Sequence, residues 1–282
     1  MRILVTGAQG QLGKATVAFL EENHKVIAYG RESLDITDTI LVNEVVRSVM
    51  PDWVLHCAAY TNVEAAEDKS NDLNWQVNVT GTANIAKAAK ATGAKLIFIS
   101  SDYVFDGKSS KNYEEIDSTN PINEYGRAKL AGEKEVQRLY PDAYIIRTSW
   151  VFGEFGNNFV YTMLNLSMKM DILKVVNDQW GRPTYTHDLA AFMAYIVEEN
   201  GVPAGVYHFS NDNVCTWYEF ATAILKDKDI VLEPCDSTVF VQKATRPKRA
   251  IMNLEKVKST GFQIPTWQNA LQRFLKNIEN IH

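Results

Sequence analysis

The sequence predicts an α/β protein in which a doubly wound parallel sheet is joined to a smaller C-terminal α/β lobe. Two observations support this fold class. Short apolar, β-branched runs alternate with longer segments of helical periodicity through the first half of the chain. The runs are apolar on both faces, as expected for strands that are covered by helices on each side. Strands that alternate with helices form right-handed crossovers, and these make the sheet parallel.

The expected elements follow this periodicity. In the first half, strands are expected at Ile3–Thr6, Val26–Tyr29, Trp53–His56, Leu96–Ser100 and Tyr144–Thr148. The helices between them are expected near Gln11–Glu22, Ile40–Val49, Leu73–Thr92 and Tyr125–Tyr140. After Trp150 the alternation weakens, and some segments are expected to return to the large sheet. The later elements, in order, are a helix near Phe159–Met168, a strand at Leu173–Val176, a helix at His187–Glu199, a strand at Val206–Phe209, a helix near Trp217–Leu225, a long loop through Arg246 and a closing helix from Trp267.

Composition limits the classes of function. The 282 residues are 46% hydrophobic and 22% charged, which is ordinary for a globular protein with a sizeable core. The net charge is −5 and no basic run is present, so nucleic-acid binding is not expected. No signal peptide or membrane-spanning run is apparent, so a cytoplasmic protein without a membrane partner is expected. Cys57, Cys215 and Cys235 form no CxxC pair and have no metal-ligand spacing with histidines, which favours free thiols and no metal site.

A glycine turn follows the first expected strand and opens the first expected helix. Its glycines are Gly7, Gly10 and Gly13. The first two permit a tight turn and close approach of a pyrophosphate, and the third lets the helix pack closely on the sheet. Backbone N–H groups at the helix start hold the phosphates, with Gln11 and Leu12 among the expected cofactor contacts. The pattern predicts a Rossmann-type dinucleotide site; an ordinary structural turn is the alternative.

The end of the second expected strand bears on the choice of cofactor. A site selective for NAD usually places an acid there, to bind the ribose 2′-hydroxyl. This chain has Arg31, which suits a 2′-phosphate, so NADP(H) is favoured and NAD(H) stays possible. The alternative is that Arg31 is a solvated surface charge. Asp35 and Ile36 lie where a loop can border the adenine.

Tyr125 and Lys129 are the predicted catalytic pair. Four residues apart, they share one face of a helix, so the ammonium stabilises phenolate character in the tyrosine and is free to bind the nicotinamide ribose. The same spacing also occurs by chance on ordinary helices, but here it follows the glycine turn and a strand that ends near Ser101. Ligands of open α/β sheets bind at such strand ends. Ser101 is therefore predicted to bond the substrate oxygen that Tyr125 protonates.

Other cofactor contacts are expected at neighbouring strand ends. Ile99 and Ser100 are expected to line the nicotinamide site. The third strand ends in Ala58, Ala59 and Tyr60, and its small side chains would let the cofactor lie across the sheet edge. Asn78, in a long helix, is expected to support Lys129 through hydrogen bonds, or else to be an ordinary polar helix residue.

These features divide the chain into two parts. Residues 1–149 are predicted to form the dinucleotide-binding domain, with a segment at about 173–209 returning to it. Residues 150–172 and 210–282 are predicted to form the substrate-binding lobe.

Together these residues resemble the extended short-chain dehydrogenase/reductase superfamily and, within it, the dTDP-4-dehydrorhamnose reductase family. The resemblance extends beyond the glycine and tyrosine–lysine patterns and covers most of the chain in order. Its motifs are Gly10–Gly13, Leu34–Asp38, Ala58–Thr61, Ser101–Gly107, Tyr125–Lys129, Arg147–Val151, Asp178–Thr184 and Arg246–Pro247.

The resemblance implies a reaction, the last step of dTDP-rhamnose synthesis for cell-surface polysaccharides. NAD(P)H would reduce the C4 carbonyl of dTDP-4-dehydro-β-L-rhamnose, giving dTDP-β-L-rhamnose. Tyr125 would be the general acid, Lys129 would orient the ribose and lower the tyrosine pKa, and Ser101 would polarise the carbonyl. The residues implied to contact the sugar nucleotide are Asp102, Trp150, Gln179, Thr184 and Arg246. Of these, Arg246 suits the diphosphate. The alternative for Arg246 is a place in an ordinary surface loop, and the alternative for Trp150 is a place in the core.

Several alternatives stay open. The substrate can be another nucleoside-diphosphate 4-keto-6-deoxysugar, acted on by a reductase or an epimerase. Elimination is disfavoured because Tyr103 stands where dehydratases carry a second acid. A non-catalytic regulatory subunit is disfavoured by the intact Tyr125 and Lys129. Some family members are described as binding Mg²⁺ at a dimer interface through an acid where this chain has Ala15, so we expect no metal and a monomer or weak homodimer.

Overall fold

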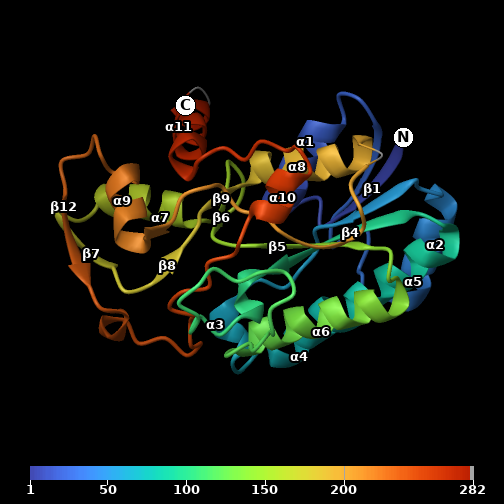
Figure 1. Cartoon of the computed structure of the whole chain (residues 1–282), viewed down its shortest axis with the longest axis horizontal. Coiled ribbons are helices and arrows are strands. Elements are labelled where there is room, and N and C mark those ends of the chain that lie inside the picture. The colour runs from blue at the N-terminus through green and yellow to red at the C-terminus, as the bar shows by residue number, and fades with distance from the viewer. Residues whose placement is uncertain (200, 280–282) are drawn as a thin grey trace.

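The computed structural model describes residues 1–199 and 201–279 (Figure 1). In these residues a six-stranded parallel sheet has the order β10-β5-β4-β3-β1-β2. The predicted fold class is confirmed, and each predicted strand of this sheet lies at its expected place in the chain. The strands are β1 (Arg2–Thr6), β2 (Lys25–Tyr29), β3 (Trp53–His56), β4 (Lys95–Ser101), β5 (Tyr144–Thr148) and β10 (Gly205–His208).

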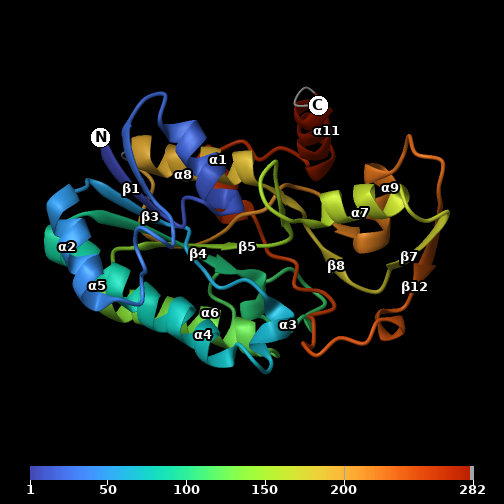
Figure 2. The ribbon, with the colours of Figure 1, turned by 180° about the vertical axis from the view of Figure 1, so that it is seen from behind.

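Helices cover both faces of this sheet, as Figures 1 and 2 show. On one face α1 (Gln11–Leu20) packs against α8 (Thr186–Glu198). On the other lie α2 (Thr39–Val49), α5 (Thr82–Thr92) and α6 (Glu124–Leu139). Side chains alternate along β1, so Ile3 and Val5 enter one apolar cluster while Leu4 enters the other. Burial on both faces explains why the strand sequences are apolar throughout.

The crossover from β3 to β4 is not the single helix that was predicted. After the short α3 (Val63–Ala66), the chain forms α4 (Asn71–Trp75), a π-helical turn η1 (Gln76–Gly81) and then α5. Such π turns are rare and are frequently found at functional sites. A Cβ on Gly132 of α6 would overlap the carbonyl oxygen of Asn78, so α6 meets this turn at a glycine.

In the described part of the chain, the second lobe contains three pairs of short strands. They are β6 (Val151–Phe152) with β9 (Thr184–Tyr185), β8 (Trp180–Gly181) with β11 (Cys215–Thr216), and β7 (Ile172–Val176) with β12 (Val231–Cys235). Its helices are α7 (Phe159–Ser167), α9 (Trp217–Ile224) and α11 (Trp267–Glu279), while α10 (Glu255–Ser259) packs beside β10. Aromatic side chains, among them Phe152, Phe220 and Phe274, fill its core.

The predicted return of residues 173–209 to the large sheet is wrong for the first strand of that segment. The β7 strand pairs with β12 in the second lobe, whereas β10 pairs with β5. The β12 strand itself falls inside the region predicted to be a long loop. The β12 strand is mostly exposed and contains Pro234, so its sequence shows neither an apolar run nor a regular alternation of apolar and polar residues.

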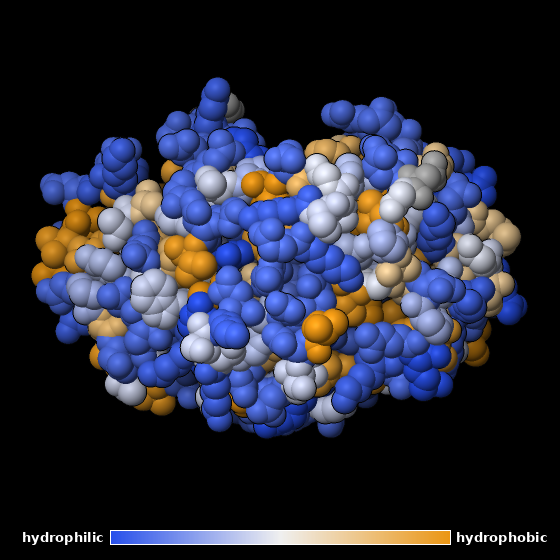
Figure 3. All heavy atoms as spheres, in the orientation of Figure 1, coloured by the Kyte–Doolittle hydropathy of each residue, from blue (hydrophilic) through white to orange (hydrophobic). Residues whose placement is uncertain are grey.

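The surface carries no extended apolar face on the side seen in Figure 3, where apolar residues are scattered among hydrophilic ones. None of the helices described is long and apolar enough to cross a membrane. Cys57, Cys215 and Cys235 are all free, as predicted.

Candidate active site

A cavity of about 650 Å³ runs along the carboxyl edge of the large sheet, from the glycine turn to the loops of the second lobe. It brings together most of the residues that sequence analysis singled out. The predicted residues that line it are Gly10, Gln11, Leu12, Gly13, Ala59, Ile99, Ser101, Asp102, Tyr125, Lys129, Trp150 and Arg246.

The glycine turn is shaped by contacts that only glycines allow. Gly7 has a φ of +66°, and a Cβ there would lie 2.6 Å from the backbone of Ala58. A Cβ on Gly13 would overlap the carbonyl oxygen of Gly7. The backbone N–H of Gly10 donates to the Gly7 carbonyl at 2.9 Å and begins α1, whose first turn carries no acidic residue. The positive end of α1 is therefore open to an anion, and the turn fits a dinucleotide diphosphate.

The three residues predicted near the adenine and its ribose separate in the structure. Arg31 follows Gly30 and is exposed. Asp35 is exposed too, and its carboxylate accepts hydrogen bonds from the N–H and hydroxyl of Thr37, which hold its pKa below the usual range. Ile36 is buried in the core of the large sheet. Of these three predicted residues, Arg31 and Asp35 thus present exposed polar groups and Ile36 does not.

Tyr125 lies in the first turn of α6, which is pressed against the end of β4. Asn123 caps the helix by accepting from the Gly126 N–H at 2.8 Å. A Cβ on Gly126 would overlap the carbonyl oxygen of Tyr103, so glycine permits this close approach. Burial raises the pKa of Tyr125 above its usual value, while its hydrogen bond with Ser101 acts in the opposite direction. The phenol is therefore held protonated, as a general acid requires.

Lys129 is 1% exposed, and its Nζ donates to the carbonyl oxygen of Ile99 at 2.8 Å. Burial lowers the pKa of Lys129 to about 8, and the charge of Glu133 one turn further along α6 opposes that shift. Asn78 does not support this lysine as predicted. Its side chain bonds the backbone of Tyr60, with Nδ2 to the carbonyl at 3.0 Å and Oδ1 to the N–H at 3.2 Å, because the π turn directs it toward the loop after β3.

Ser101 ends β4 and lies beside Tyr125 at the cavity. Its hydroxyl donates to Oδ1 of Asp102 at 3.1 Å and accepts from the N–H of Tyr103 at 3.2 Å. Asp102 is 4% exposed, and burial raises its pKa to about 7 despite the hydrogen bond from Ser101. The Ser101 hydroxyl thus donates its single proton to the buried carboxyl group of Asp102. A substrate hydroxyl can replace Ser101 as the donor to that group.

The predicted substrate contacts beyond β5 fall into two groups. Trp150 lines the cavity with a left-handed backbone, φ +47°, and its indole stacks on that of Trp217 with centroids 3.5 Å apart. Gln179 and Thr184 are buried and do not line the cavity. Thr184 instead supports its wall from behind, because its N–H donates to the Trp150 carbonyl at 3.1 Å.

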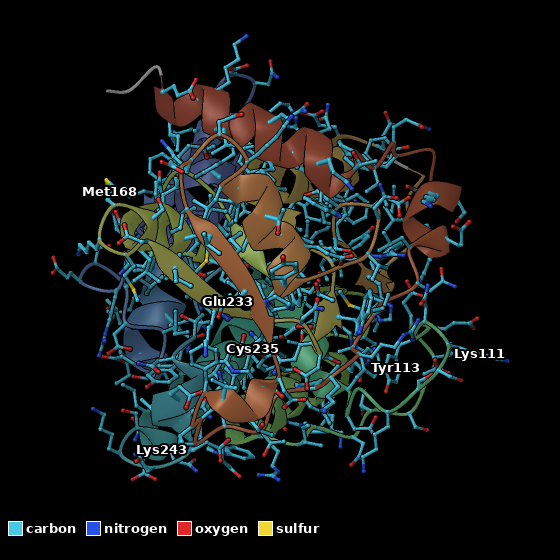
Figure 4. All side chains as sticks on the ribbon, turned by 90° about the vertical axis from the view of Figure 1, so that its left-hand side faces the viewer. Lys111, Tyr113, Met168, Glu233, Cys235 and Lys243 are labelled. Carbon is cyan, nitrogen blue, oxygen red and sulfur yellow. The ribbon has the colours of Figure 1, made fainter. Side chains whose placement is uncertain are left out.

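Arg246 reaches the cavity from a segment we call the strap, Ser237–Arg249, which follows β12. Its Nη2 donates to Glu64 of α3 at 3.0 Å, while its Nε is buried without a partner in the described residues. The strap also contacts the turn that follows α3, where Lys243 pairs with Asp68. Figure 4 shows the chain passing from Glu233 and Cys235 of β12 to Lys243. The strap therefore brings the Arg246 guanidinium to the cavity, with one donor that has no partner in the described residues.

Several lining residues were not predicted. The ring of Tyr103 meets Tyr125 edge-on with centroids 5.8 Å apart, and burial raises the pKa of Tyr103 to about 12 although Arg246 opposes the shift. Trp217 begins α9 in a capping box formed by Thr216 and Glu219, a local pattern that marks a helix start and nothing about a ligand. The remaining ones are Cys57, Thr61, Val63, Thr148, Ser149, Val151, Gly156 and Asn157.

Comparisons with known proteins agree with this geometry. The family described as RmlD substrate binding domain matches residues 1–280. A dTDP-4-dehydrorhamnose reductase from Aggregatibacter actinomycetemcomitans is 38% identical over 96% of this chain and 97% of its own length. A dTDP-4-keto-6-deoxy-D-glucose reductase from Streptomyces niveus is 37% identical over 96% of this chain and 95% of its own length. The crystal structure of a dTDP-4-dehydrorhamnose reductase from Bacillus anthracis, in complex with NADP, has a TM-score of 0.94 at 39% identity and covers 98% of this chain and 99% of that one. This chain belongs to the dTDP-4-dehydrorhamnose reductase family of oxidoreductases.

Proposed function

We propose that the protein reduces the C4 carbonyl of dTDP-4-dehydro-β-L-rhamnose, giving dTDP-β-L-rhamnose with NADPH as the reductant. One observation carries the proposal. A protonated tyrosine, a buried lysine and a serine hydroxyl converge on a single cavity that continues to a glycine turn fitted to a dinucleotide. Family membership and the NADP bound to the Bacillus anthracis relative support both the reaction and the cofactor.

The chain's own residues perform the proton chemistry. NADPH, when bound, supplies the hydride that attacks the carbonyl carbon. The Tyr125 hydroxyl gives its proton to the carbonyl oxygen as that oxygen gains negative charge. Lys129, one turn along α6, stabilises the tyrosinate that results and orients the nicotinamide ribose. Ser101 donates a hydrogen bond to the same oxygen once a substrate hydroxyl has taken its place on Asp102.

The sugar nucleotide is bound by Asp102, Trp150 and Arg246 in this proposal. The buried carboxyl group of Asp102 accepts from a sugar hydroxyl, and Trp150 forms the wall beside the sugar. Arg246 meets the diphosphate, because a guanidinium donates two parallel hydrogen bonds to phosphate oxygens and its Nε has no partner in the described part of the chain. Gln179 and Thr184 act on substrate only through Trp150 and the lobe behind it.

Arg31 is proposed to select NADPH by pairing with the 2′-phosphate. Residues 1–149 would bind the dinucleotide, and residues 150–172 and 210–282 would bind the sugar nucleotide. We further propose a cytoplasmic enzyme that is a monomer or a weak homodimer. Ala15, fully buried in α1, offers no ligand for a metal-linked dimer.

The test is the absorbance of NADPH with purified protein and dTDP-4-dehydro-L-rhamnose, together with chromatographic detection of dTDP-L-rhamnose. The expected result is stoichiometric oxidation of NADPH and formation of that product. Cofactor binding without turnover would refute the rhamnose assignment.

A second candidate is reduction of another dTDP-4-keto-6-deoxyhexose. It is favoured by the likeness to the Streptomyces niveus enzyme named for dTDP-4-keto-6-deoxy-D-glucose. Comparing kcat/KM for the two keto sugars in the same assay decides between them. An epimerase would instead retain its cofactor through each cycle, so NAD(P) that copurifies and stays unconsumed would favour that class.

A further inference from the structure

We infer that Trp217 is a positioning residue for the sugar nucleotide. Trp217 holds the indole of Trp150 in place, and that indole forms the wall of the substrate site. The inference rests on the proposed function and deepens it, because it assigns substrate specificity to a residue on α9. Trp217 and Trp150 come from different elements, and both line the cavity that contains Ser101 and Tyr125.

Trp150 adopts a backbone conformation that a bulky residue rarely takes. Its φ of +47° lies in the left-handed region, where a side chain with a Cβ is strained. Such a conformation persists only where neighbouring contacts over-determine it. Two of those contacts are made by backbone groups beside Trp150. The Thr184 N–H donates to the Trp150 carbonyl at 3.1 Å, and Gly181 is a glycine where any Cβ would overlap the edge of the indole.

The third contact is the stack with Trp217. The two indoles are nearly parallel, at 8°, with centroids 3.5 Å apart, which is a face-to-face rather than an offset arrangement. Aromatic pairs left to themselves prefer offset or edge-on geometry, because face-to-face rings bring like quadrupoles together. The surroundings therefore impose this geometry. Phe159 packs against Trp217 at 4.5 Å, and the capping box at Thr216 fixes the start of α9.

Trp217 consequently covers one face of the Trp150 ring, Gly181 lies against the edge of the indole, and Trp150 still lines the cavity. Removing Trp217 would release the strained residue to turn away from the site. The catalytic groups would not move with it, because Ser101 lies on β4 and Tyr125 and Lys129 lie on α6. The loss should therefore appear in the KM for the sugar nucleotide and not in kcat.

The experiment compares Trp217→Ala, Trp217→Leu and Trp217→Phe with the wild type. Trp267→Phe is the matched control, since Trp267 packs edge-on against Phe220 in the same lobe and does not line the cavity. Kinetics with both substrates are combined with the exciton couplet that stacked indoles give in circular dichroism.

The expected result is a rise of about tenfold in the KM for the sugar nucleotide in the alanine and leucine variants, with kcat within about twofold of wild type. Phenylalanine, which keeps a flat ring, should restore most of the affinity. The KM for NADPH should not change. In the wild type and the Trp267→Phe variant, product should alter the couplet, and in the Trp217 variants the couplet should be absent.

Equal KM values in the leucine and phenylalanine variants would overturn the inference, and this pair decides even if Trp217→Ala does not fold. A fall in kcat of more than about twofold that also occurs in Trp267→Phe would overturn it too, because it would report general loosening of the lobe. A wild type that does not reduce the keto sugar would refute the proposed function instead, so the two failures are distinguishable.

Discussion

The carboxyl edge of the large sheet and the strap hold their side chains by different means. At the sheet edge, Ser101 is paired in the strand ladder with Thr148, and the almost fully buried Lys129 is anchored by the Ile99 carbonyl. In the strap, Arg246 is held by Glu64, whose side chain is 39% exposed, and Lys243 by an exposed carboxylate. In the proposed function, the chemistry is thus set by buried backbone, while the proposed recognition of the diphosphate depends on side-chain pairs that solvent can weaken.

The largest effect is expected for Tyr125→Phe, which tests the sheet-edge side of this comparison. Loss of the general acid should lower kcat by roughly 10²–10⁴-fold with little change in either KM. Steady-state oxidation of NADPH measures it. Tyr113→Phe is the control, because Tyr113 is also buried and hydrogen-bonded, to Asp106, but lies outside the cavity. A smaller fall than in that control would remove Tyr125 from the mechanism.

The buried ion pair under α6 should dominate stability at the sheet edge. Glu133 of α6 and Arg147 of β5 are almost fully buried and form two-pronged hydrogen bonds, including Arg147 Nη2 to Glu133 Oε2 at 2.8 Å. Glu133→Gln leaves the guanidinium without its counter-charge and should cost about 3–5 kcal/mol of unfolding free energy. Glu135→Gln breaks an exposed pair with Arg138 on the same helix and should cost less than about 1 kcal/mol. Equal losses of unfolding free energy in the two variants, measured by denaturant unfolding, would refute the contrast between the buried and the exposed pair.

In the strap, Arg246→Ala should raise the KM for the sugar nucleotide roughly 10–100-fold, since hydrogen bonds to charged groups contribute about 1.5–3 kcal/mol. Arg246→Lys should restore little, because an ammonium cannot reproduce the planar pair of donors. Lys243→Ala removes only an exposed pair and should change KM by less than about fivefold. Initial rates at varied substrate measure all three. An effect of Lys243→Ala as large as that of Arg246→Ala would mean that the strap acts as a unit and not through its guanidinium.

The smallest effect concerns Asp102, at the boundary between the two regions. Burial raises its pKa to about 7, so the folded state binds more protons than the unfolded state between pH 4 and 7, and stability is lost as pH rises through that range. Asp102→Asn removes this loss. Its melting temperature should exceed that of wild type by about 2–4 °C for each kcal/mol gained at pH 8, and should match wild type near pH 4. Activity should fall in the same variant. Melting curves that shift equally at both pH values would contradict the role of the buried carboxyl group.

The same contrast explains which parts could be predicted from sequence. The glycine turn and the Tyr125–Lys129 pair are defined by spacing within one strand-to-helix turn and one helix, so their geometry follows from local structure. Ser101 could be predicted because parallel strands end at one edge. By contrast, Trp217 reaches the site from a helix far along the chain, and its partner Trp150 depends on a left-handed backbone that no periodicity announces.

Other features were missed because tertiary contacts decide them. The π turn at Gln76–Gly81 redirects Asn78 from Lys129 to Tyr60, although its sequence continues a helical pattern. The pairing of β7 with β12 joins two short, half-exposed strands. Gln179 and Thr184 share a motif with residues near the site, yet both side chains are buried behind it. A sequence motif thus indicates which segments lie near the site, and the tertiary structure determines which of their side chains line the cavity.

The most direct test of the proposed reaction is to follow the hydride itself. The protein is incubated with dTDP-4-dehydro-L-rhamnose and NADPH deuterated at the nicotinamide C4 position, and the product is examined by nuclear magnetic resonance. The account predicts dTDP-L-rhamnose with deuterium at C4 of the sugar in one configuration, and loss of that product in the Tyr125→Phe variant. Deuterium at any other carbon, or product formed without transfer of label, would contradict reduction at C4.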